Sequence, residues 1–364
     1  MKFQFFIFTV LVLLTGIYLG VFRVAYPLQS TYSLFIYLSL IVFGFVKGSL
    51  NLLSGLISDK YGRKAALISG WLVALPLPLI SFITFSNELI TILTSLIALN
   101  QAFTWTTTVT SQIDIAGKRR SGLAVGINEA SGYGGVTLGG LIAGLAIYKS
   151  LSPYIFMLLV SLVALFFSSA IAVETSKLIL KKGFTSSSSL LLPILIGIPG
   201  LLEKFVDSFY WATAPLYLKS LGLRPLDIAL VISTYTFTWT FTQPIFGFLS
   251  DLVNRKSVIL LGFASMALGV ILFPYNFYIA SLINGLGMGM VYPTLIALVN
   301  DVVNEAIRGK ALGIYRLLRD FGYGVSGVVL IFISFSLIEV TLLIALLQLI
   351  AFLIILVIRI KVVE

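Results

Sequence analysis

The sequence predicts an all-α polytopic membrane protein of twelve transmembrane helices, arranged as two six-helix bundles related by a pseudo-twofold axis. Three observations lead to this prediction. Of the 364 residues, 59% are hydrophobic and only 10% are charged, whereas soluble domains carry about 25% charged residues. Apolar runs of about 20 residues, the length that crosses a bilayer, recur between short polar breaks. A charged turn occurs twice, at Asp59–Lys64 and Asp251–Lys256, which is typical of an internal repeat.

The apolar runs define the expected spans in chain order. They cover residues 5–28, 33–57, 65–85, 89–112, 121–147, 153–173, 190–218, 226–250, 257–273, 276–300, 310–334 and 338–358. The first run is too long for the core of a signal peptide and lacks a small-residue cleavage pattern, so we interpret it as a span. Together the spans use about 250 residues. This leaves short loops and no room for a soluble catalytic or nucleotide-binding domain.

The longest polar break, residues 174–189, divides six spans from six. It contains three lysines and the run Ser186–Ser189, a composition typical of flexible linkers. We therefore expect an N-terminal bundle over residues 1–173, a cytoplasmic linker over residues 174–189 and a C-terminal bundle over residues 190–364. Self-comparison supports the division, because the two charged turns align at an offset of 192 residues and Asp114 aligns with Asp301 at an offset of 187.

The basic residues indicate how the chain is oriented. Sixteen of the 24 lie in loops on one side of the expected membrane, against three on the other, so both termini are predicted to be cytoplasmic. The net charge of +10 belongs to these loops and forms no basic stripe, so we expect no nucleic-acid partner. The chain has no Cys and no His. We therefore expect no metal and no cofactor, and only carboxylates can carry protons near neutral pH.

The first charged turn carries a family resemblance. The segment Gly55-x-x-x-Asp59-Lys60-x-Gly62-Arg63-Lys64 resembles the signature loop of the major facilitator superfamily. The second copy keeps Gly247, Asp251, Arg255 and Lys256 but has Val253 and Asn254 where a glycine often stands. Segments around residues 100–114, 126–133 and 313–322 resemble a prokaryotic branch of permeases and exporters. The resemblance implies two bundles around a central cavity that opens alternately to either side of the cytoplasmic (inner) membrane.

We expect the two turns to act as latches between the bundles. In the first copy Gly55 permits close approach of helices, and Arg63 can close back on Asp59. The expected latch residues are Gly55, Asp59, Gly62, Arg63, Lys64, Asp251, Arg255 and Lys256, together with Arg316, Arg319 and Asp320 from the span over residues 310–334. Because the second turn lacks a glycine, we expect it to hold less firmly than the first.

Several charges fall inside the expected spans, where an ionisable group is a functional candidate because its burial in lipid is costly. Lys47 and Asp320 lie about 16 and 15 Å from the cytoplasmic ends of their spans, counting ~1.5 Å per residue. The resemblance implies that the spans over residues 33–57 and 310–334 pack against each other. We therefore predict that Lys47 and Asp320 pair between the bundles, with Arg316 and Arg319 directed toward Asp59. Arg23 and Asp207 lie at matching depths of about 27 and 26 Å. The resemblance implies that their two spans face each other at the central cavity, which makes the pair a candidate outer gate. The alternative is that both side chains extend separately to the membrane surface.

Three acids are candidates for proton coupling: Glu129, Asp207 and Glu203. Glu203 precedes Asp207 by one helical turn, and two neighbouring carboxylates favour binding of a proton. Glu129 occupies the repeat position of Arg316, so it is either a structural partner of an unidentified cation or a proton carrier. The candidates for the substrate cavity are polar, charged or aromatic side chains within spans, for which helix packing is the alternative. They are Arg23, Lys47, Gln101, Trp105, Tyr210, Trp211, Trp239, Asn284 and Tyr292.

The resemblance implies a secondary active transporter that moves a small organic solute by alternating access. We expect it to be proton-coupled, to catalyse efflux, and to work as a monomer surrounded by membrane lipid. The alternative is an uptake permease for a small, anionic metabolite met by Arg23 or Lys47. A channel and a membrane-embedded enzyme are more remote alternatives: a channel does not need duplicated latches, and the chain has no His, no Cys and no paired-carboxylate metal motif. We therefore do not expect an enzyme.

Overall fold

A computed structural model describes residues 2–117, 120–175, 190–303, 308–332 and 336–358, and this part of the chain is helical and contains no strand. The first half contains α1 (Lys2–Gln29), α2 (Ser33–Tyr61), α3 (Arg63–Leu72), α4 (Pro76–Ile83), α5 (Asn87–Ala116), α6 (Ser121–Tyr148), α7 (Pro153–Phe166) and η2 (Phe167–Ile171). The second half contains α8 (Leu191–Ser208), η4 (Phe209–Thr213), α9 (Ala214–Ser220), α10 (Pro225–Leu252), α11 (Arg255–Leu272), α12 (Phe277–Asp301), α13 (Arg308–Phe332) and α14 (Leu337–Val357).

These elements form the twelve expected membrane-spanning rods, because some rods consist of two or three pieces. The span predicted over residues 65–85 is interrupted between α3 and α4, where Pro76 begins the second piece. A proline lacks the N–H that would continue the helix. The span over residues 190–218 runs through α8, η4 and α9. Its wider turn, η4, immediately precedes Pro215 in α9, and a π-type turn is a common way to absorb a proline or a functional constraint.

Nine helices in the described part are long and apolar enough to cross a membrane by themselves. The remaining rods are α8 to α9, α10 and α13. Two of these rods carry buried charges: Glu203, Lys204 and Asp207 lie in α8, and Arg319 and Asp320 lie in α13. The rods that deviate most from an ordinary apolar span therefore contain much of the polar centre of the molecule.

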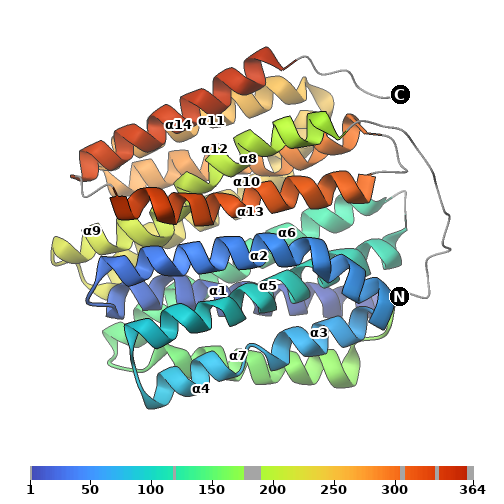
Figure 1. The fold of residues 1–364 in the computed structure, drawn as a ribbon, viewed down its shortest axis with the longest axis horizontal. Coiled ribbons are helices and arrows are strands. Elements are labelled where there is room, and N and C mark those ends of the chain that lie inside the picture. The colour runs from blue at the N-terminus through green and yellow to red at the C-terminus, as the bar shows by residue number, and fades with distance from the viewer. Residues whose placement is uncertain (1, 118–119, 176–189, 304–307, 333–335, 359–364) are drawn as a thin grey trace.

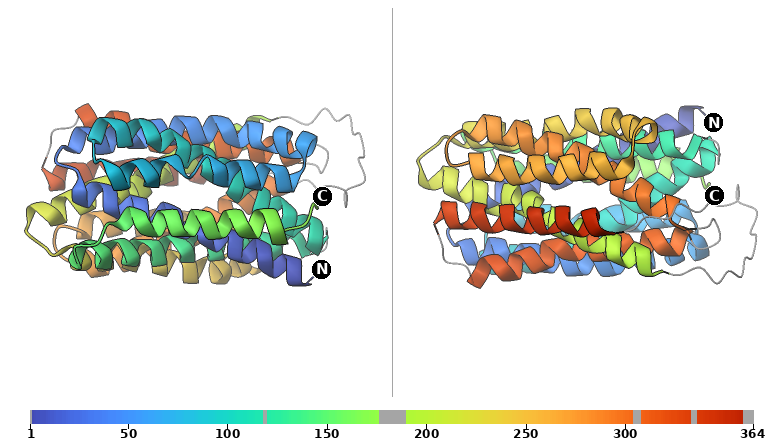
Figure 2. Two further views of the ribbon diagram at one scale, coloured as in Figure 1. Left: turned by 90° about the horizontal axis from the view of Figure 1, so that it is seen from below. Right: turned by 90° about the horizontal axis from the view of Figure 1, so that it is seen from above.

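The rods run side by side along the long axis of the molecule and form two groups (Figure 1). Helices of the first half lie on one side and helices of the second half on the other. The groups meet where α2 packs against α13 and where α6 packs against α10. Helix α1 begins and α14 ends at the same end of the molecule (Figure 2), which we call the termini end. The opposite end, with residues 30–32 and 221–224, is the far end.

The bundles are in close contact at the far end and diverge toward the termini end. Along α6, a Cβ added to Gly144 would collide with Ala229 of α10, and one added to Gly134 would lie 3.7 Å from Thr240. A Cβ added to Gly126, nearest the termini end, would meet no described atom within 4 Å. The interface between α6 and α10 is therefore closed at the far end, and among the described residues its contacts become looser toward the termini end.

Candidate functional site

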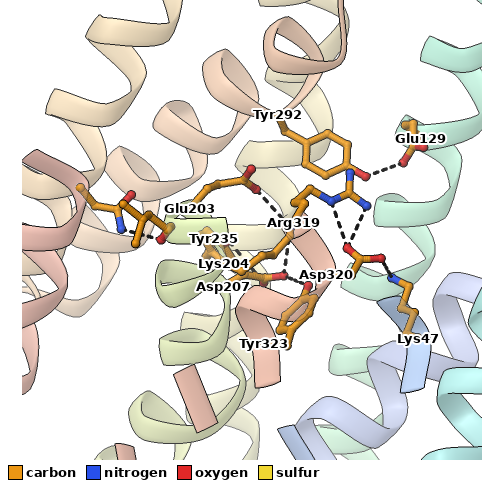
Figure 3. Close-up of polar contacts among 12 residues, drawn as sticks. Lys47, Glu129, Glu203, Lys204, Asp207, Tyr235, Tyr292, Arg319, Asp320 and Tyr323 are labelled. Carbon is orange, nitrogen blue, oxygen red and sulfur yellow. Dashed lines mark hydrogen bonds and ion pairs between the residues drawn. The ribbon is translucent and has the colours of Figure 1, made fainter. Parts of the chain in front are cut away.

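Nine charged side chains gather between the bundles, and we call them the central cluster. The first bundle contributes Arg23, Lys47 and Glu129; the second contributes Glu203, Lys204, Asp207, Arg316, Arg319 and Asp320. Figure 3 shows most of them, with Lys47 and Glu129 facing side chains of the opposite bundle. Three ion pairs cross the interface, namely Arg23 with Asp207, Lys47 with Asp320, and Arg316 with Glu129. These pairs link the two bundles electrostatically across their interface.

The pair of Arg23 and Asp207 is the most deeply buried of the three. Their side chains are 2% and 0% exposed, so the alternative in which they extend separately to the membrane surface is wrong. Arg23 donates to the Asp207 carboxylate and, at 3.2 Å, to its carbonyl oxygen. The hydroxyls of Tyr323 and Tyr235 also donate to this carboxylate. A buried ion pair is tolerated only when such additional hydrogen bonds satisfy its remaining polar atoms.

Asp320 is the second focus of charge, and its predicted contact with Lys47 is confirmed at 3.6 Å. The same carboxylate accepts hydrogen bonds from Arg319 Nε at 3.0 Å and from Asn51 Nδ2 at 2.6 Å. The guanidinium of Arg319 also lies 4.8 Å from the centre of the Tyr292 ring. Two cations thus share one carboxylate at the crossing of α2 and α13.

The predicted direction of Arg316 and Arg319 toward Asp59 stays a prediction, and the described contacts of both side chains lie within the central cluster. Arg319 turns to Asp320, and Arg316 Nη2 lies 3.7 Å from Glu129. Both acids are buried between the bundles, and a buried carboxylate attracts the nearest available cation. The side chain of Asp59 and Gly55 lie outside the described part of the structure, so the predicted contact of Arg63 with Asp59 stays a prediction.

Glu129 is held by both bundles. It accepts hydrogen bonds from Trp105 Nε1 and from the Tyr292 hydroxyl, each at 3.2 Å, besides its ion pair with Arg316. The structure thus identifies the structural partner that sequence reasoning left open. Because a paired carboxylate can still bind a proton when its partner withdraws, the second interpretation of Glu129 also stays open.

Lys204 is a member of the cluster that the sequence analysis did not select. Its Nζ lies 3.1 Å from Glu203 and 3.9 Å from Asp207, and it faces the ring of Tyr323 at 5.3 Å. The expected pair of neighbouring carboxylates is therefore joined by an amine. The sequence could have indicated Lys204, because Glu203, Lys204 and Asp207 fall within five residues of one apolar span. Three charges in a span are costly to bury unless they pair.

A small cavity with a volume of about 20 Å³ lies at the centre of the cluster. That is room for about one water molecule and not for an organic solute. Of the predicted cavity residues, Arg23, Lys47, Gln101, Trp105 and Tyr292 line it, and so do Glu129, Arg316, Arg319 and Asp320. The cavity is also lined by residues that were not predicted from the sequence, namely Leu19, Asn51, Thr106, Tyr133 and Tyr323.

Four predicted cavity residues do not line this cavity: Tyr210, Trp211, Trp239 and Asn284. Asn284 donates to the Tyr210 hydroxyl at 3.1 Å, and Tyr210 stacks on Tyr235 with ring centres 4.1 Å apart. Trp211 packs behind Arg23, and Trp239 packs behind Tyr133. A polar or aromatic side chain within a span faces a neighbouring helix as readily as a cavity, and in these four cases packing within or between helices uses the side chain.

The two charged turns have equivalent contacts in the two halves. Arg63 Nε lies 3.3 Å from Asp114, and Arg255 pairs with Asp301, which is the repeat equivalent of Asp114. Each arginine also donates to the serine five residues before it, at 2.6 Å in the first half and 3.0 Å in the second. Arg255 additionally contacts Asp251 at 2.7 Å. The predicted repeat is therefore present in side-chain contacts as well as in sequence.

The first turn is more enclosed than the second. The Arg63 side chain is 6% exposed, against 22% for Arg255. Glu174 accepts hydrogen bonds from the backbone N–H groups of Arg63 and Lys64, at 2.9 and 3.1 Å, and so caps the start of α3. Gly62 precedes them with a φ of +97°, a conformation that favours glycine.

The second turn is tied to the last helix in a different way. Lys256 Nζ donates to the carbonyl oxygens of Leu356 and Ile358, at 2.7 and 3.2 Å. The Asn254 side chain caps the start of α11 by accepting from Lys256 N at 2.8 Å. Each turn is thus anchored to the end of the sixth rod of its own bundle. The expected linker lies outside the described residues from residue 176 to residue 189.

Comparisons with known proteins agree with this architecture. The sequence profile of the Major Facilitator Superfamily matches residues 4–201 and 200–363. The quinolone resistance protein NorA of Staphylococcus aureus (strain MRSA252) is 28% identical over 114 residues, which is 30% of this chain. That match spans only 29% of the relative's length. The curated relative is therefore similar to one part of the chain.

Two solved transporters share the fold over nearly the full length. The inward-open xylose transporter XylE from E. coli has a TM-score of 0.73 at 15% identity, covering 97% of this chain and 96% of XylE. The nucleoside transporter NupG has a TM-score of 0.73 at 14% identity, covering 98% of both chains. At such low identity the likeness shows the fold alone. The profile match spans both halves of the chain, and with the two six-helix bundles it shows that this protein is a multi-pass membrane transporter belonging to the major facilitator superfamily.

Proposed function

We propose that this protein is a secondary active transporter that exports a small organic solute across the cytoplasmic membrane by alternating access, coupled to protons. The observation that carries the proposal is the central cluster, whose three ion pairs cross the interface just where the bundles begin to diverge. Opening of the far end must separate the partners on opposite bundles. The charges therefore make the energy of the cluster depend on the conformation, which is the requirement for coupling.

Charge balance supports a proton as the coupling ion. With the far end closed, the acids Glu203 and Asp207 are compensated by Lys204 and Arg23. If Arg23 withdraws with the first bundle, two buried acids share one lysine. An uncompensated carboxylate in a low-dielectric site binds a proton to lose its charge. The open far end thus favours one bound proton, and closure releases it.

The direction and orientation are part of the proposal. The excess of basic residues in loops at the termini end favours a cytoplasmic location for that end. The partial relative is named a quinolone resistance protein, which favours export over uptake. The two charged turns, at the termini end of the bundles, are proposed to stabilise the alternative conformation in which that end closes. The division at residues 174–189 is proposed to be the linker that lets the bundles move separately.

Transport by purified protein in proteoliposomes tests the proposal. Compounds that raise the melting temperature are first identified, and their gradient-driven movement is measured with and without a pH difference. We expect Asp207→Asn, Glu203→Gln and Glu129→Gln to lose the response to the pH difference. Asp227→Asn, which removes an acid outside the cluster, serves as the matched control and should retain it. Undiminished coupling in all three variants would refute proton coupling through these residues, and absence of counterflow would indicate a channel.

A further inference from the structure

We infer that the cargo is a monovalent organic anion with a flat apolar body, and that its charged group binds to Lys47, next to Arg319. This inference rests on the proposed transport function and names its substrate class. It begins from the charges of the central cluster, which contains five cations and four acids. A surplus charge buried between helices is costly unless a counter-charge accompanies it. A bound monovalent anion supplies that counter-charge.

The surplus positive charge can be located. Arg23, Lys204 and Arg316 each have an acid that serves mainly as their own partner, namely Asp207, Glu203 and Glu129. That leaves Asp320 to compensate both Lys47 and Arg319. The cation without an acid of its own therefore lies at the crossing of α2 and α13, beside the cavity (Figure 3).

The hydrogen bonds at this crossing leave the Lys47 ammonium group available to a ligand. Arg319 directs Nε and Nη2 to Asp320, at 3.0 and 2.9 Å. Its Nη1 makes no hydrogen bond with any group in the described part of the chain, although the residue is only 5% exposed. Lys47 Nζ reaches Asp320 only at 3.6 Å, because Asn51 holds the same oxygen at 2.6 Å. Nη1 is itself buried and lies on the edge of the guanidinium opposite Asp320. A carboxylate or sulfonate in the cavity can therefore accept a charge-assisted hydrogen bond from Lys47 Nζ, whose side chain is 13% exposed, while Arg319 contributes its charge.

The acids of the cavity are much less available to a cationic ligand. Glu129 is occupied by Trp105, Tyr292 and Arg316. Asp320 is occupied by Arg319, Asn51 and Lys47. A cation entering the cavity would have to displace one of these partners and would increase the positive surplus. The lining therefore selects against a cation by charge as well as by hydrogen bonding.

The walls beside the surplus charge indicate the rest of the cargo. Trp105, Tyr133 and Tyr292 line the cavity, and the Tyr133 ring contacts the other two, with ring centres 5.3 Å from Trp105 and 5.5 Å from Tyr292. Aromatic walls bind flat apolar groups by stacking or edge contacts. The present cavity holds about one water molecule, so the cargo enters as the bundles separate further from the termini end. A small ring acid satisfies both the charge and the walls.

Equilibrium binding in detergent tests this inference with three probes of nearly equal shape: benzoate, benzamide and benzylammonium. We expect benzoate alone to raise the melting temperature of the wild-type protein at millimolar concentration. Lys47→Gln removes one charge-assisted hydrogen bond and should weaken benzoate binding about tenfold or more. Lys149→Gln, which removes an exposed cation outside the cluster, should leave it unchanged. Asp320→Asn enlarges the positive surplus and should strengthen benzoate binding.

An equal response to all three probes, a preference for benzylammonium, or undiminished benzoate binding by Lys47→Gln would overturn the inference. Weaker benzoate binding by Asp320→Asn would do the same, and this variant keeps the test decisive if Lys47→Gln does not fold. The measurement requires neither a membrane nor a gradient. Failure of anion binding beside intact gradient-driven transport therefore overturns only the substrate class. Selective anion binding without any gradient-driven transport instead refutes the proposed function.

Discussion

Replacing Arg23 by Gln is expected to open the far end of the transporter, because its ion pair with Asp207 joins the two bundles there. Both side chains are buried, at 2% and 0% exposure. Removing one partner of a buried ion pair costs about 3–5 kcal/mol. Lys204, 3.9 Å from Asp207, and the Tyr323 hydroxyl still compensate part of the remaining charge, so the cost should be near the lower value. About 3 kcal/mol corresponds to a change of about a hundredfold in the ratio of closed to open molecules.

A cysteine at position 233 reports this opening. Ser233 is 5% exposed and donates to the Thr137 carbonyl oxygen at 3.4 Å, within the contact of α6 with α10. The chain has no other Cys, so a maleimide labels only this position when the far end opens. In Ser233→Cys protein, Arg23→Gln should accelerate labelling by up to about a hundredfold, because labelling follows the open fraction.

The double variant provides the internal control. Arg23→Gln with Asp207→Asn removes both charges and leaves no unpaired ion, so its labelling should be slower than that of either single variant. Lys149→Gln should label at the parent rate. The pair would not hold the far end closed if Arg23→Gln left the labelling rate unchanged. The same would follow if the double variant accelerated labelling by the product of the two single accelerations.

Three further predictions concern the turns and the interface. Arg63→Gln should lower the melting temperature more than Arg255→Gln does. The Arg63 side chain is 6% exposed and that of Arg255 is 22% exposed, and exposed ion pairs contribute only about 0–1 kcal/mol to stability. A larger decrease for Arg255→Gln would contradict this reasoning. Gly62→Ala should lower the melting temperature, because φ is +97° and ψ is 156°, a backbone region that is essentially restricted to glycine and costs a residue with a Cβ about 1–3 kcal/mol. An unchanged melting temperature would show that the turn accommodates a Cβ without strain. Gly144→Leu should accelerate labelling of the Ser233→Cys reporter, because its side chain collides with Ala229; unchanged labelling would mean that this contact adapts without separating the bundles.

Much of the fold could be predicted from the sequence because lipid imposes one simple constraint on every span. Each apolar run needs about 20 residues and must satisfy its own backbone hydrogen bonds as a helix. The repeat of the charged turns then predicted two equivalent halves. Hydropathy alone does not show the interruption between α3 and α4, because it does not respond to the backbone donor that Pro76 lacks.

The contacts in the site were predictable where matching depth and the helix neighbours implied by the family resemblance together determine them. Lys47 with Asp320 and Arg23 with Asp207 lie at matching depths along spans that the resemblance places side by side. The contact of Arg316 with Glu129 also depends on the direction in which each side chain leaves its helix. Likewise, the polarity of Tyr210 and Asn284 indicated that each needs a partner, but not that each would find it in the other.

The most direct test of alternating access is a pair of distances between spin labels, one across each end of the molecule. Introduced cysteines at Leu123 and Leu252, which are 65% and 67% exposed, place labels on both bundles at the termini end. Cysteines at Thr31 and Ser220 do so at the far end, where Lys219 donates to the Ser30 carbonyl oxygen at 2.9 Å. Arg23→Gln is predicted to lengthen the far-end distance while the termini-end distance shortens. Distances that lengthen together, or a change at one end alone, would contradict two bundles rocking about the central cluster.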